Sequence, residues 1–177
     1  MPKVKSRLSP EAARQRKNNM KKVSKEVADF WKEFCQLQPE VNPDTPFQVW
    51  YFGLTREEAE ELCNLVLEGK KTATASLTAE YEKQPEDAPV MNGYSVVTDF
   101  DGKPKCVIQT TELRVVPYNE VDAEFAFNEG EGDQSLDYWR EAHWDYFSKR
   151  CAEIGIEPSL EMSVNCERFR LLYPTAK

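Results

Sequence analysis

The stretch EGKKTATASLT, residues 68–78, connects a predicted helix to a predicted strand, and the rest of the fold is inferred outward from it. Upstream, Thr55 and Glu58 have the spacing of a capping box, and Gly69 is a helix stop signal. Downstream, hydroxyl residues alternate with apolar residues, which is the period-two pattern of a strand over 72–78. The strand therefore has one hydroxyl face and one apolar face, with two lysines at its start.

Helices and strands alternate on both sides of this stretch. The apolar patterns and turn signals predict strands over 47–52, 72–78, 93–99, 105–115 and 164–173, and helices over 55–68, 119–128 and 135–154. Asp101-Gly102 is a hairpin turn signal between two of the strands. About five to six strands in mixed order favour an α+β domain, a small, partly closed β-barrel with helices packed outside.

The N-terminal part differs from the rest in charge. Residues 1–25 carry nine Lys or Arg and one Glu, a net charge of +8, which leaves −16 on the remainder because the whole chain is at −8. We divide the chain into a basic helical extension with a linker over 1–45 and one domain over 46–177. An apolar stripe of the extension is predicted to pack on the domain (Val23, Val27, Phe30, Phe34 and Leu37). The basic residues are a solvated face, contact nucleic acid, or dock on the acidic body.

Composition excludes several classes of protein and of site. No apolar run has membrane-spanning length, no apolar stretch of signal-peptide type begins the chain, and the protein is expected to be cytoplasmic. The five cysteines form no C-x-x-C pair and the single histidine is His143, so we expect reduced thiols, no metal and no cofactor. The charge of the body disfavours extended, non-specific binding of nucleic acid.

The two lysines allow two interpretations. Lys70 and Lys71 form an exposed, charged helix end, or Lys71 points into a pocket. There, desolvation would lower its pKa and make it a base or a nucleophile. Lys71 and Thr74 are three residues apart, so they share a site only if Lys71 precedes the pleat of the strand or a bulge re-aims it.

Acidic residues alternate with glycines in the segment FNEGEGDQ. Glu129, Glu131 and Asp133 stand immediately before the predicted helix over 135–154. In one interpretation, their negative charges stabilise the positive N-terminal end of that helix. In the other, Glu129 pairs with a lysine, and the glycines let the backbone approach a ligand. The spacing is not that of a calcium loop.

The aromatic segment 138–147 and the last strand add further candidates. Trp144 and Tyr146 lie off the apolar side of their helix, so one of them is a candidate to stack on a base. His143 is predicted to be buried and hydrogen-bonded, with catalysis as the alternative. Arg168, if it faces the barrel, requires a carboxylate or phosphate partner.

Three segments together resemble the ASCH domain family, a PUA-like superfamily, and its uncharacterised bacterial branch with G-x-K-T-A-T and E-G-E-G-D motifs. They are VLEGKKTATASL, VIQTTELRVVPYNEVDAEFAFNEGEGDQSLDYWREAHWDYF and VNCERFRLLY, within 46–173. The resemblance implies a PUA-like β-barrel with a cleft at its mouth for RNA or a modified nucleoside. Some superfamily members are amidohydrolases that deacetylate N(4)-acetylcytidine, and another is a ribonuclease.

The resemblance also implies residue roles. In the amidohydrolases, the motif lysine, its second threonine and a downstream glutamate carry the reaction, which places catalytic roles on Lys71, Thr74 and Glu129. We assign ligand contacts to Lys70, Thr72, Ser76, Glu131, Asp133, Trp144 and Arg168. Ala75-Ser76 departs from those enzymes, which have a bulky residue and an arginine there, so the substrate is open. Two functions remain open: a module that binds RNA, a nucleoside or a nucleotide, and a hydrolase. The oligomeric state is open as well.

Overall fold

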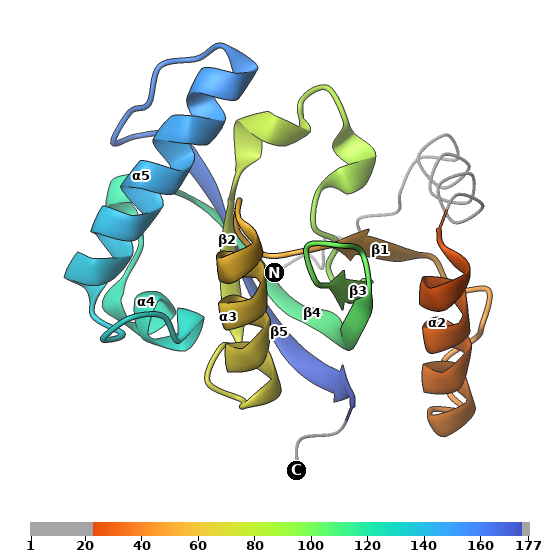
Figure 1. Cartoon of the computed structure of the whole chain (residues 1–177). Helices are drawn as coiled ribbons and strands as arrows, with labels where there is room; N and C mark the ends of the chain where they lie inside the picture. Colours follow the sequence, from red (N-terminus) through yellow and green to blue (C-terminus); the bar gives the residue numbers. More distant parts are fainter. Residues whose placement is uncertain (1–22, 175–177) are drawn as a thin grey trace, which may run out of the picture.

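Five strands form one mixed sheet in the order β1-β3-β4-β5-β2 in the computed structural model, which describes residues 23–174 (Figure 1). The strands are β1 (Phe47–Trp50), β2 (Ala73–Leu77), β3 (Tyr94–Thr98), β4 (Pro104–Pro117) and β5 (Ser163–Tyr173). β1 pairs with β3 in parallel, and the other three pairings are antiparallel. The hairpin predicted at Asp101-Gly102 joins β3 to β4, and Gly102 has a φ of 83°.

The sheet is open, which corrects the expectation of a partly closed barrel. β1 and β2 are its two edges, and closure would require these edges to pair with each other. Instead, residues of both edge strands line a cavity between them, among them Trp50 and Thr74. The pocket therefore lies where β1 and β2 would pair in a closed barrel.

Within the described residues, four helices pack around this sheet. They are α2 (Lys25–Leu37), α3 (Arg56–Leu67), α4 (Ala123–Glu129) and α5 (Leu136–Ile154), with short 3₁₀ turns η1 (Thr78–Tyr81), η2 (Pro85–Asp87) and η3 (Tyr118–Glu120). The predicted helix over 119–128 thus begins later, at Ala123, because η3 precedes it. None of the described helices is long and apolar enough to cross a membrane.

Each face of the sheet has its own apolar cluster. α3 follows Thr55, which caps it in the predicted capping box, and its apolar side is buried against one face (Cys63, Val66, Val97, Ile108, Phe169). α2 packs on the opposite face at the β3 side (Trp31, Phe34, Val96, Val107), and α4 and α5 pack near β2 and β5 (Phe125, Trp139, Phe147, Leu77, Val164). Figure 1 shows α2 and α5 at opposite ends of the sheet.

The predicted apolar stripe of the extension is partly correct. Val27 and Phe34 are buried in the cluster below α2, and Val23 and Phe30 pack against it, whereas Leu37 is 60% exposed at the end of the helix. Most of the basic residues on which the predicted extension is based lie in 1–22, outside the described residues. All five cysteines are free and buried, as predicted.

Candidate functional site

Lys71 lies in the connection between α3 and β2. The backbone N–H groups of Lys70 and Lys71 both donate to the Leu65 carbonyl, at 2.9 and 3.0 Å, so both residues belong to the turn that ends α3. β2 begins only at Ala73, so Lys71 precedes the pleat, which is the condition under which it can share a site with Thr74. Of the two interpretations of the lysines, the second is correct: Lys71 points inward and Lys70 outward, and their side chains are 1% and 61% exposed.

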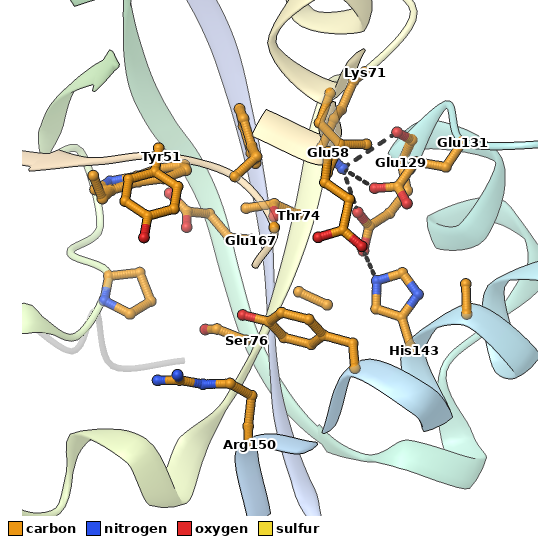
Figure 2. A pocket seen from close by; sticks show the side chains of 18 of the residues that line it. Tyr51, Glu58, Lys71, Thr74, Ser76, Glu129, Glu131, His143, Arg150 and Glu167 are labelled. Carbon is orange, nitrogen blue, oxygen red and sulfur yellow. Dashed lines mark hydrogen bonds and ion pairs between the residues drawn. The ribbon is translucent and has the colours of Figure 1, made fainter. Parts of the chain in front are cut away.

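The Lys71 ammonium is held by two carboxylates. Its Nζ lies 2.6 Å from Glu129 Oε2 and 2.6 Å from Glu131 Oε1, and Figure 2 shows both contacts at the wall of the pocket. The Glu129 backbone carbonyl faces it as a third acceptor at 3.4 Å. Glu129 is as buried as Lys71, whereas the Glu131 side chain is 17% exposed. Two of the three N–H donors of Lys71 are therefore fully engaged, and the third is weakly engaged.

The second oxygen of Glu129 is held from α5. Trp139 Nε1 donates to Glu129 Oε1 at 3.0 Å, and His143 Nε2 lies 3.2 Å from the same oxygen. His143 Nδ1 lies 2.9 Å from the Trp139 carbonyl oxygen. Both ring nitrogens of His143 thus face oxygen atoms. The Glu129 carboxylate is consequently fixed at both oxygens.

The charges of the cluster determine its protonation. Burial alone would raise the pKa of the Glu129 carboxyl, but Lys71 and His143 hold that pKa well below its usual range. Burial alone would lower the pKa of Lys71, but the two carboxylates at contact distance outweigh it and raise that pKa. The expectation that burial lowers the pKa of Lys71 is therefore wrong: the two carboxylates raise that pKa and favour the ammonium form.

Gly130 allows the two parts of the cluster to meet. α4 ends at Glu129, and Gly130 follows it with a φ of 74°. A Cβ atom at Gly130 would lie 2.6 Å from the Lys70 carbonyl oxygen and 2.9 Å from the Lys71 nitrogen. Only glycine lets the two backbones approach so closely, and this explains the first glycine of the E-G-E-G-D motif.

We expect Gly130→Ala to destabilise the protein more than Gly69→Ala. Both glycines have a φ of 74°, so either alanine costs about 1–2 kcal/mol in conformational strain. A Cβ atom at Gly69 meets nothing within 4 Å, whereas at Gly130 it meets backbone and must push Glu129 away from Lys71. Thermal unfolding of the two variants is the measurement, and equal losses would show that the close approach at Gly130 is unimportant.

The cluster forms one end of a cavity of about 410 Å³. The hydroxyl face of β2 turns toward the cavity with Thr74 and Ser76, and the other face places Ala73 and Leu77 in the core beneath α5. The other walls come from β1 and the residues after it, α3, η1, α5 and β5 (Gln48, Trp50, Tyr51, Phe52, Glu58, Glu61, Glu80, Tyr81, Tyr138, His143, Tyr146, Arg150 and Glu167). The strand interpretation of the opening stretch is thereby confirmed.

Of the ten predicted site residues, five line this pocket: Lys71, Thr74, Ser76, Glu129 and Glu131. Lys70 does not, because it pairs with Glu68 on the surface. Thr72 lies before β2, where its hydroxyl donates to the Asn128 carbonyl at 3.4 Å.

The other three predicted contacts also lie away from the pocket. Asp133 accepts the Ser135 N–H and is a turn residue before α5. Trp144 packs on Tyr118, so Tyr146 is the aromatic residue of that pair that borders the pocket. Arg168 has the carboxylate partner that we expected, but it is Glu124 on α4, at 3.1 Å.

Sequence reasoning missed several polar pocket residues, among them Arg150 and Glu167. Arg150 is one of many charged residues on α5, and it pairs with Glu80 and Glu153. Glu167 had a weaker signal, since it is the one acidic residue of β5. Such a residue faces either solvent or a polar cavity, and here it faces the cavity.

The cluster offers three donors of metal-ligating type. One oxygen each of Glu129 and Glu131 and a nitrogen of His143 lie within 4.8 Å of one another. The Lys71 ammonium, however, already contacts both carboxylates at 2.6 Å, so a cation there would meet a positive charge at short range. The arrangement fits an internal ion-pair network better than a metal centre.

With the fold and this geometry, the chain can be compared with known proteins. The family model of the ASCH domain matches residues 48–173. The chain belongs to the ASCH domain family. Two solved structures are similar to this ASCH protein, each with a TM-score of 0.75. An ASCH domain from Lactobacillus crispatus JV V101 is 34% identical, over 86% of this chain and 97% of that one. A protein of Enterococcus faecalis V583 is 31% identical, over 84% and 91%.

No curated protein matches the chain. The predicted family and α+β PUA-like fold are confirmed, with the difference that the sheet is open.

Proposed function

We propose that this ASCH protein binds a single nucleoside in the pocket between β1 and β2. The observation that carries the proposal is a cavity of about 410 Å³ with aromatic side chains on several sides. That volume lies in the lower part of the range of about 300–1,000 Å³ found for small-molecule sites. The aromatic residues are Trp50, Tyr51, Phe52, Tyr81, Tyr138 and Tyr146. Stacking on such rings contributes about 1–3 kcal/mol per base.

The charge of the pocket favours a nucleoside over a phosphorylated ligand. Six glutamates line the pocket (Glu58, Glu61, Glu80, Glu129, Glu131 and Glu167), against one lysine and one arginine, Lys71 and Arg150. Both basic side chains are already paired with carboxylates. A phosphate group would therefore meet net negative charge without an uncommitted cation among the described lining residues. An RNA strand is disfavoured for the same reason.

Titration calorimetry with the four ribonucleosides, their 5′-monophosphates and a short single-stranded RNA tests the proposal. We expect at least one nucleoside to bind, and its monophosphate to bind about tenfold more weakly or worse, a loss of about 1.4 kcal/mol. Tighter binding of the RNA than of any nucleoside, with a steep salt dependence, would instead identify a strand-binding module.

A pair of variants locates the site. Tyr51 lines the pocket and is 43% exposed, and Phe100 lies beside it, with ring centroids 5.2 Å apart, but is not a lining residue. Tyr51→Ala should weaken nucleoside binding, whereas Phe100→Ala should leave it nearly unchanged.

Amide hydrolysis is a second candidate, and one observation favours it. Lys71, Thr74 and Glu129, the residues that the family resemblance makes catalytic, all line the same pocket. Since Lys71 is an ammonium, its role would be to donate its weakly engaged N–H to the acyl oxygen and stabilise the oxyanion. Water, oriented by Thr74, would attack the carbonyl carbon, and a carboxylate of the cluster would pass the proton of that water to the leaving amine as the C–N bond breaks.

A further inference from the structure

Glu167 is a buried acid in the pocket that the charge cluster does not use. It lies on β5 directly opposite Thr74 of β2, so the two side chains share one face of the sheet. Glu167 is 6% exposed and lines the pocket (Figure 2). It thus provides a polar group on the sheet side of a pocket whose other sides carry aromatic residues.

The partners of Glu167 differ from those of Glu129. The Thr110 hydroxyl donates to Glu167 Oε1 at 2.5 Å, and within residues 23–174 no Lys, Arg or His pairs with the carboxyl. Oε2 has no hydrogen-bond partner in the same part of the chain. Oε2 is not among the enclosed polar atoms of the described residues, and Glu167 lines the pocket, so Oε2 opens to the pocket and is placed to meet a ligand.

The surroundings of Glu167 favour its neutral form. Burial raises the pKa of the carboxyl, and the Thr110 hydrogen bond opposes this only in part. A neutral carboxyl presents one O–H donor beside one acceptor, whereas a carboxylate presents acceptors alone.

We propose that Glu167, as a neutral carboxyl, recognises the edge of the bound base through one donated and one accepted hydrogen bond. The matching ligand edge has an amino N–H beside a ring nitrogen acceptor, as in cytosine or adenine. Oε2–H donates to the ring nitrogen, and the remaining lone pair of Oε1 accepts the amino N–H. This assignment rests on the proposed function, and it names the ligand class: nucleosides with an amino-substituted pyrimidine edge that keeps at least one N–H.

Glu167→Gln and Glu167→Leu separate the two protonation states. Glutamine also presents a donor beside an acceptor, so it should bind cytidine within about threefold of the native affinity. Leucine presents neither and should weaken binding by about tenfold, the effect of one or two net hydrogen bonds. N(4),N(4)-dimethylcytidine lacks the amino N–H, so it should bind the native protein weakly and lose little more in Glu167→Leu. Thermal unfolding of each variant verifies that it is folded.

The outcomes separate this assignment from the proposed function. If Gln weakens cytidine binding as much as Leu does, the carboxylate is the active form and the assignment is overturned. If Leu binds normally, Glu167 does not recognise the ligand. If the native protein binds no nucleoside, the proposed function fails and the assignment fails with it.

A ligand-free measurement adds an independent check. The side-chain carboxyl ¹³C resonance of Glu167, identified by its absence in Glu167→Gln, should report a protonated group at neutral pH. An ionised group there would contradict the assignment whatever the binding data show.

Discussion

Lys71→Met is expected to lower the free energy of unfolding by about 3–5 kcal/mol. Methionine keeps the length of the side chain but removes the charge that neutralises Glu129 and Glu131, both of which lie 2.6 Å from Lys71 Nζ. Glu129 is 1% exposed, so its carboxylate would be left buried beside an apolar group. Urea denaturation at neutral pH, with the native protein in parallel, is the measurement.

Lys70→Met is the matched control one residue earlier. The Lys70 side chain is 61% exposed, and its ion pair with Glu68 is on the surface, so the loss should be within about 1 kcal/mol. Similar losses in the two variants would mean that Lys71 does not stabilise the cluster. In Lys71→Met/Glu129→Gln, part of the loss should be recovered, because both members of the buried pair are neutralised together.

Glu129→Gln is expected to slow hydrolysis of N(4)-acetylcytidine by about 100- to 10,000-fold if the protein is an amidohydrolase. Glutamine keeps the shape of the side chain but cannot accept and return a proton. Chromatographic detection of released cytidine gives the rate. Because Glu129 also bonds Lys71 and Trp139, the variant should be less stable, so its rate must be measured below its melting transition.

Two variants on β2 complete this test. Thr74→Val keeps the size of the side chain and should lower the rate strongly with little change in stability, whereas Ser76→Ala, two residues further along the strand from Lys71, should lower the rate less. A native rate in Glu129→Gln would make Glu129 a structural residue. Absence of turnover by the native protein on acylated nucleosides would leave binding as its function.

Local patterns predicted much of this site. The capping box at Thr55 and Glu58 and the alternation over 72–78 are local features, and both elements form as expected. From the same patterns it followed that Lys71 and Thr74 can share a pocket if Lys71 precedes the pleat of the strand. The turn at Gly69 fulfils this condition. Such signals work because helix caps and strand pleats depend on neighbours a few residues away.

The features that sequence reasoning missed depend on distant neighbours. The pKa of Lys71 depends on Glu129 and Glu131, which are 58 and 60 residues later in the chain, and burial alone gave the wrong direction. Closure of the sheet depends on whether β1 and β2 meet, which no local pattern encodes. Selection of Tyr146 over Trp144 depends on how α5 is rotated about its axis.

The open sheet also makes the pocket mechanically adjustable. Its two walls, β1 and β2, are separated by the four strand pairings of the sheet, and each pairing contributes a twist of roughly 20–25°. A small change in twist at each pairing adds up across the sheet and alters the distance between the walls without breaking a sheet hydrogen bond. Register shifts in these pairings, such as that between Thr110 and Glu112, are where such twist concentrates. Substitutions there can change the width of the pocket, and thus the size of the ligand that fits, without replacing any residue that lines it.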